Sequence, residues 1–162
     1  MRIIKDKKIQ QDDWNLINQP DTAGSLPDGD VIVPFAYWKD NQDACTAHKG
    51  NVAVMINGDT AITDVASFLD KFELIALDFP AFKDGRCYSH ARVLRDRYKY
   101  QGDIRAVGDV LRDQLFYMMR CGVSSFAVRE DRDMEDALNG LKDFSVTYQS
   151  ASDDSLPLYK TR

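Results

Sequence analysis

Residues 103–128, which read DIRAVGDVLRDQLFYMMRCGVSSFAV, decide the fold because they switch twice between two hydrophobic patterns. The apolar run Asp103–Val107 predicts a strand, the periodicity of Val110–Cys121 predicts a helix, and Ser124–Val128 predicts a second strand. Strand and helix alternating at this spacing predict right-handed crossovers and parallel neighbours in one sheet.

The same alternation continues on both sides of this unit. It predicts strand Glu73–Leu77 and helix Cys87–Tyr98 before the unit, and helix Met134–Leu141 after it. The predicted fold class is therefore α/β, with a mainly parallel sheet of alternating strand–helix units and a β-rich N-terminal part. These units fit either an open sheet or a four-unit curl that resembles half a barrel, and both arrangements stay open.

The outer parts of the chain complete this prediction. The expected elements are a hairpin or irregular arm over Arg2–Ile9 and Trp14–Ile17, a loop over Gln19–Asp30, strands Val31–Trp38 and Asn51–Ile56, helix Thr63–Lys71 with Thr63 as N-cap, and a last strand over Phe144–Gln149. Pro34 cannot donate to a β-ladder, so it favours an edge position or a bulge. We expect one α/β domain over residues 1–149 and a loosely ordered tail over residues 150–162.

Composition excludes several classes of protein. The 21 basic and 26 acidic side chains give a net charge of -5 without a basic stripe, which argues against nucleic acid as a partner. No segment resembles a signal peptide or a membrane span, so no membrane partner is expected. The 3 cysteines are odd in number and too few for a disulfide scaffold, which is typical of a reducing compartment and predicts a cytoplasmic location. The sequence leaves homo-oligomers open.

The segment from Leu77 to Gln114 is dense in arginine and predicts a cluster of ion pairs or an anion site. The candidate residues are Asp78, Asp84, Arg86, Tyr88, Ser89, Arg92, Arg95, Arg105, Asp109 and Gln114. Arg105 lies near the carboxyl end of a predicted buried strand, where its guanidinium requires a carboxylate or a ligand. We expect Arg86, Arg92 and Arg105 to converge with Asp78, Asp84 or Asp109 at the carboxyl edge of the sheet.

Two interpretations of this cluster remain open. One is an internal network, in which Arg105 pairs with Asp78 or Asp109 and Arg86 pairs with Asp84. The other is an oxyanion or phosphate site formed by Arg86, Ser89, Arg92, Arg105 and a helix N-terminus.

Two further residues of this segment have expected structural roles. Asp109 is expected to cap the helix that follows it. Gln114 falls in the middle of an apolar helix face, so it is expected to be buried and hydrogen-bonded.

Other chemistries have weaker support. Cys45-x-x-His48 and Cys87-x-x-His90 offer the ligand types of a zinc site, but neither pair sits in a knuckle and buried apolar cysteines are the preferred interpretation. No metal is therefore predicted. The sequence has no Gly-x-Gly-x-x-Gly motif and no Walker loop, so the cofactor stays unknown. Catalytic residues are unknown too, although Tyr88, Asp78 and Asp109 are candidate acids or bases.

Several short motifs resemble those of a bacterial family known as domain of unknown function nine-three-four. They are Asp84-Gly85-Arg86, Tyr88-Ser89, Leu94-Arg95, Gly102, Arg105-Ala106, Gly108-Asp109-Val110-Leu111, Asp113-Gln114 and Arg120-Cys121-Gly122. The resemblance extends to Val33-Pro34, Trp38, Phe79-Pro80, Phe82 and Phe144–Gln149. The chain departs from the family pattern at Cys87, where a glycine is usual, and at Val123, where an aromatic residue is usual.

Members of this family are often described as oxidoreductases of sulfite reduction, so the resemblance implies a role in sulfite or sulfate assimilation. We expect an accessory protein of assimilatory sulfite reduction that acts with sulfite reductase. The alternative is an enzyme, an oxidoreductase that binds a small oxyanion or an anionic cofactor through the arginine cluster. The missing cofactor motif and the lack of a nucleophile–base pair favour the accessory interpretation.

Overall fold

The computed structural model describes residues 1–20, 26–152 and 160. Its strands are β1 (Arg2–Lys5), β2 (Lys8–Gln11), β3 (Asn15–Leu16), β4 (Val31–Pro34), β5 (Val52–Ile56), β6 (Leu74–Phe79), β7 (Asp103–Gly108) and β8 (Ser125–Phe126). Its helices are α1 (Phe35–Asp40), α2 (Gln42–Thr46), α3 (Ile62–Ala66), α4 (Arg86–Asp96), α5 (Arg112–Arg120) and α6 (Met134–Gly140), with a 3-10 turn over Leu69–Lys71. Within the described ranges, no helix is long and apolar enough to span a bilayer.

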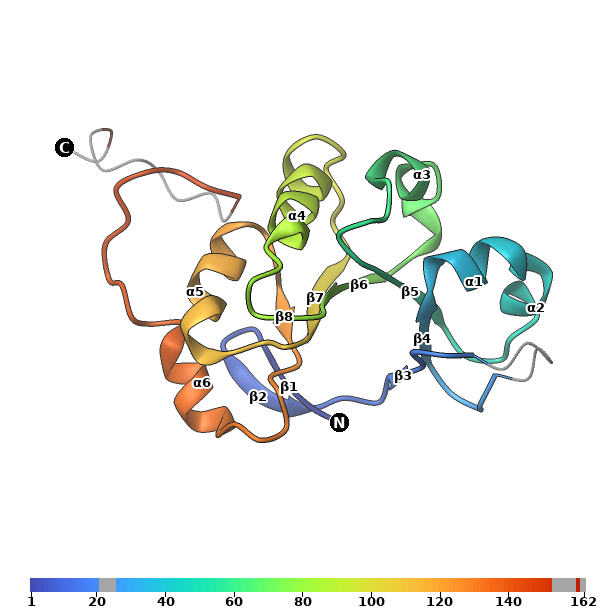
Figure 1. Cartoon of the computed structure of the whole chain (residues 1–162), viewed down its shortest axis with the longest axis horizontal. Coiled ribbons are helices and arrows are strands. Elements are labelled where there is room, and N and C mark those ends of the chain that lie inside the picture. The colour runs from blue at the N-terminus through green and yellow to red at the C-terminus, as the bar shows by residue number, and fades with distance from the viewer. Residues whose placement is uncertain (21–25, 153–159, 161–162) are drawn as a thin grey trace.

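All strands form one sheet in the order β2-β1-β8-β7-β6-β5-β4-β3. From β3 to β8 the neighbours are parallel and follow one another in sequence order, whereas β1 pairs antiparallel with β2 and β8. Because right-handed crossovers in sequence order all fall on one side of a sheet, α1, α3, α4 and α5 share one face. The sheet curls around the opposite face (Figure 1), so the predicted α/β class is confirmed and the curl replaces the open sheet.

Side chains alternate between the two faces of the sheet. On β6, Ile75, Leu77 and Phe79 join the core beneath the helices, while Leu74 and Ala76 join a smaller apolar cluster on the concave side. We call this concave side the inner face. The segment between β2 and β3 crosses it (Figure 1), and Trp14 from that segment packs against its apolar cluster.

A buried ion-pair network fastens this crossing segment to the sheet. Arg105 on β7 is only 2% exposed and points to the inner face. Its Nη1 donates to Asp12 Oδ2 at 2.8 Å, its Nε donates to Ser125 Oγ at 3.2 Å, and its Nη2 lies 3.5 Å from Asp103 Oδ2. Burial would raise the pKa of Asp103, but hydrogen bonds from Ser124 and Ser125 and the charges of Lys5 and Arg105 lower it below its usual value.

The predicted partners of Arg105 were therefore wrong. Arg105 occupies the third position of β7 and does not reach Asp78 or Asp109 at the carboxyl edge. Its main partner, Asp12, lies 93 residues earlier in the chain. Strand and helix periodicity cannot reveal such a pairing, because it depends on the path of the N-terminal segment across the inner face.

Three local predictions need correction for identifiable reasons. Residues 35–38 form the start of α1 rather than the end of a strand, because helical spacing stacks Phe35 on Trp38 with ring centroids 5.9 Å apart. α3 begins at Ile62 with Ala61 as N-cap, so Thr63 lies inside the helix. α5 begins after Leu111, so Asp109 does not cap it.

The last predicted strand, Phe144–Gln149, is also absent from the described sheet. This segment leaves α6 and returns to the C-terminal end of α5 (Figure 1). There Gln149 O accepts a hydrogen bond from Arg120 Nη2, and Ser152 N donates to Arg120 O at 3.2 Å. Most of the tail predicted over residues 150–162 lies outside the described residues.

Replacing Asp12 by alanine should destabilise the protein by about 3 kcal/mol, because one partner of a buried ion pair would be lost and the Arg105 charge left undercompensated. Urea unfolding followed by circular dichroism measures this loss. Asp13→Ala is the matched control, since Asp13 is exposed and its removal should change stability by less than about 0.5 kcal/mol. Equal losses in the two variants would show that the network does not stabilise the fold.

Candidate functional site

The carboxyl ends of the parallel strands form a rim that carries several of the predicted site residues. Asp78 lies on β6 and Asp84 follows that strand, while Asp109 follows β7. In curled sheets of strand–helix units, this end of the strands is the usual location of functional groups. The structure adds Asp59 and Arg129 to the rim, and sequence reasoning missed both.

Arg86 is held by carboxylates at the rim. Its Nε donates to Asp84 Oδ1 at 3.0 Å, its Nη2 donates to Asp84 Oδ2 at 2.8 Å, and its Nη1 pairs with Asp59. Hydrogen bonds from Arg86 lower the pKa of Asp84 to about 2. The predicted Arg86–Asp84 pair is confirmed, and all three guanidinium nitrogens have an acidic partner.

Asp109 joins two loops of the rim. Its Oδ1 accepts from Arg129 Nη1 at 2.7 Å, and its Oδ2 accepts from the backbone N–H of Phe82 at 2.9 Å. Arg129 also pairs with Asp131. Asp109 therefore fixes the loop before α4 against the segment that follows β8.

Asp78 differs from the other rim carboxylates because its side chain has no hydrogen-bond or ion-pair partner among the described residues. Burial and the nearby charge of Asp84 raise the pKa of Asp78. The carboxylate lies against Gly108, where a β-carbon would be 2.8 Å from Asp78 Oδ1 and where φ is +91°. An unpaired carboxyl with a raised pKa at this end of a central strand is a candidate acid or base.

Arg92 and Arg95 do not join the rim, so the predicted convergence of Arg86, Arg92 and Arg105 is wrong. Arg95 lies nine residues after Arg86, which is at the rim end of α4, and this spacing is about 13 Å along the helix axis. Its guanidinium donates to the carbonyls of Gly122 at 2.9 Å and Tyr100 at 2.6 Å, near the amino end of β7. Arg92 pairs with Asp96 on the outside of the same helix.

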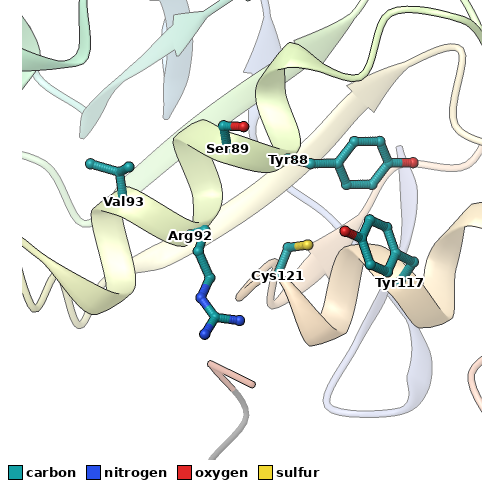
Figure 2. Close-up of a pocket in the computed structure, with 6 residues that line it drawn as sticks. All are labelled: Tyr88, Ser89, Arg92, Val93, Tyr117 and Cys121. Atoms are coloured by element: carbon teal, nitrogen blue, oxygen red, sulfur yellow. The ribbon is translucent and has the colours of Figure 1, made fainter. Parts of the chain in front are cut away.

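A groove of about 370 Å³ lies between α4 and α5 (Figure 2). Its lining residues are Tyr88, Ser89, Arg92, Val93, Tyr117 and Cys121. The Tyr88 and Tyr117 rings approach each other across the groove, with centroids 5.1 Å apart. The groove thus brings together three of the predicted site residues with three others, Val93, Tyr117 and Cys121.

The groove contains a protonated thiol. Burial raises the pKa of Cys121, against the opposing influence of a hydrogen bond from Tyr117 and of the positive charges on Arg92 and Arg120. Burial likewise raises the pKa of Tyr88 to about 12. Tyr117 and Cys121 stand four positions apart on the chain, and this helical spacing beside the apolar stripe of α5 is the signal that could have identified them.

Gln114 is buried and bonded, as predicted. Gln114 is 7% exposed, and its Oε1 accepts a hydrogen bond from the backbone N–H of Leu111 at 3.0 Å. Gln114 also lowers the pKa of Tyr88 slightly, against the larger effect of burial. Gln114 therefore fixes the start of α5 and acts on a tyrosine of the groove.

The two Cys-x-x-His pairs do not form a metal centre in the described part of the chain. The Cys87 thiol donates to the carbonyl of Asp78 at 3.2 Å, and the His48 ring bonds to the carbonyl of Gly29 at 2.7 Å.

The chain matches the model of a known protein family. Residues 53–159, about two-thirds of the chain, match the family described as bacterial protein of unknown function (DUF934). The chain belongs to this family. A search of curated proteins gave no match.

Gln114→Ala should destabilise the protein by about 1 kcal/mol, because the N–H of Leu111 would lose its acceptor at the start of α5. Gln114→Glu is the matched variant, since a glutamate keeps the accepting oxygen and suits this helix position. Chemical denaturation distinguishes them. If both variants lose the same stability, the hydrogen bond to Leu111 is not the source of the effect.

Asp78 should titrate above the ordinary aspartate pKa of about 3.9. Because the folded pKa is raised, stability contributed by this group is present at low pH and decreases as pH rises through the folded pKa. Asp84→Asn should lower the pKa of Asp78 by removing the neighbouring negative charge. Asp43→Asn on α2 serves as the control and should leave it unchanged.

Carboxyl carbon NMR during a pH titration measures the pKa of Asp78 in the wild-type protein and in both variants. An Asp78 signal that titrates at or below the ordinary value would contradict it, as would a wild-type pKa retained in Asp84→Asn.

Proposed function

We propose that this member of the DUF934 family is a cytoplasmic accessory protein of assimilatory sulfite reduction that acts by binding sulfite reductase. The role in sulfite reduction rests on the family resemblance of the sequence motifs. The observation that supports binding, as opposed to turnover, is a set of exposed apolar side chains around α5.

This set consists of Tyr117, Phe144, Val146 and Tyr148, whose exposed fractions are 60%, 63%, 64% and 67%. We call it the aromatic surface. Single exposed apolar residues are common on proteins, but neighbouring ones are typical of protein-binding surfaces, and aromatic residues are enriched there.

Two members of the aromatic surface, Tyr117 and Phe144, pack against neighbouring rings. The Phe144 ring packs on Phe116 of α5 with centroids 4.9 Å apart. The Tyr117 ring packs on Tyr88 of α4, and Gln149 is anchored by Arg120. Pre-ordered side chains lose less conformational entropy on binding, which favours affinity.

The arginines also support an accessory role. Arg86, Arg95 and Arg105 direct their guanidinium donors to carboxylates, hydroxyls and carbonyls of the protein itself. They stabilise loops and strands, and this use of their donors favours the internal-network interpretation of the cluster at these three positions.

The test is a binding measurement between the purified protein and purified sulfite reductase hemoprotein by isothermal titration calorimetry. The double variant Phe144→Ser/Tyr148→Ser should bind about tenfold more weakly or worse, because buried aromatic side chains dominate interface energies. Phe82→Ser is the matched control, since Phe82 is a 56% exposed aromatic residue in the loop before α4 and lies outside the aromatic surface.

Absence of binding by the wild-type protein would reject the proposed partner. Equal weakening by Phe82→Ser would reject the aromatic surface as the binding site.

A further inference from the structure

Arg92 differs from the other predicted site arginines in how its donors are used. Its Nε pairs with Asp96 Oδ2, and the other Asp96 oxygen accepts from Ser152 Oγ at 2.9 Å. Among the described residues, Arg92 Nη1 and Nη2 have no partner. Arginine has five N–H donors, so the bond to Asp96 orients the guanidinium without using its Nη donors.

The groove around Arg92 provides hydrogen-bond donors, and Asp96 pairs with Arg92 beside it. Hydroxyl groups of Tyr88, Ser89 and Tyr117 line it together with the Cys121 thiol. None of the described residues that line it carries a carboxylate. Positive charge from Arg92 and Arg120 reaches Cys121, and so does the negative charge of Asp96.

Figure 2 shows how these groups are arranged. Tyr88 extends from α4 toward Tyr117, Arg92 extends from the lower edge of the same helix in this view, and Cys121 directs its sulfur toward the Tyr117 hydroxyl. A volume of about 370 Å³ is at the small end of the range for ligand pockets, which is about 300 to 1,000 Å³. The groove therefore suits a small ligand that accepts hydrogen bonds.

We propose that the groove between α4 and α5 binds one small oxyanion, with Arg92 donating through Nη1 and Nη2. A guanidinium edge matches two oxygens of an oxyanion, and charge-assisted hydrogen bonds of this kind are the stronger class. Sulfite, sulfate and phosphate share this chemistry. The site lies away from the rim where the sequence analysis expected an anion, and it does not depend on binding to sulfite reductase.

The position of the site has a physical reason. At the rim, Arg86 meets the carboxylates of Asp59 and Asp84, so an added anion would be repelled there. On the inner face, Arg105 is buried and paired with Asp12. Within residues 1–20, 26–152 and 160, Arg92 combines solvent access with a single paired carboxylate, Asp96, which uses only its Nε.

The test is thermal unfolding of the full chain in sodium sulfite, sulfate or phosphate, with sodium chloride at the same ionic strength as reference. An anion present at tenfold its Kd should raise Tm by about 3 to 6 °C. The three anions distinguish a pyramidal from a tetrahedral ligand. Because sulfate and phosphate also stabilise proteins by exclusion from their surface, stabilisation above chloride supports the site where Arg92→Gln reduces it.

Variants test whether the anion binds in the groove at Arg92. Arg92→Gln should weaken binding about tenfold or more by removing the paired charged donors. Arg97→Gln is the matched control, because it removes the same charge from an exposed position at the end of α4 outside the groove and should keep wild-type affinity.

Amide NMR of the wild-type protein provides a measurement that does not depend on any variant folding. Addition of the anion should shift the resonances of residues 89–93 and 117–121 before others. Stabilisation by chloride equal to that by all three oxyanions would overturn the proposal, as would equal loss in Arg92→Gln and Arg97→Gln.

Discussion

The buried charge of Arg105 is the constraint on which the architecture depends. A guanidinium that is 2% exposed must have acidic partners, because an uncompensated buried charge costs several kcal/mol. Asp103 supplies one partner from the same strand, and Asp12 supplies the other from the segment that crosses the inner face. The ion pair therefore determines where the N-terminal segment lies and closes the concave side of the curled sheet.

Closing the inner face decides where function can be located. The apolar cluster on that side is covered by the crossing segment, so the accessible polar groups lie at the rim and on the helical layer. At the rim, Arg86 and Arg129 each join loops through aspartates, which makes them structural connections. Asp78 is the exception there, since its carboxyl group faces Gly108 and has no partner in the described part of the chain.

The sequence predicted those features that depend on local patterns. Alternating strand and helix periodicity was enough for the parallel order of β6, β7 and β8, and the position of Gln114 on an apolar face was enough for its burial and hydrogen bond. The Asp84–Arg86 pair could be predicted because both residues lie in one turn. The partner of Arg105 could not, because a contact between residues 93 positions apart depends on the complete chain path. The β-like pattern of Phe144–Gln149 also misled, since α5 holds that segment through Arg120 and Phe116.

Arg92 and Arg95 show why spacing alone could not separate structural from available arginines. They stand three positions apart on α4, so their side chains diverge by only about 60° around the helix axis. That difference turns Arg95 toward the carbonyls of Tyr100, Gly102 and Gly122, which occupy its donors at the amino end of β7. It turns Arg92 outward, where Asp96 binds only the Nε side. Two arginines in one helix thus have different roles: Arg95 attaches the helix to the sheet, whereas Arg92 keeps the Nη donors that we propose for a small anion.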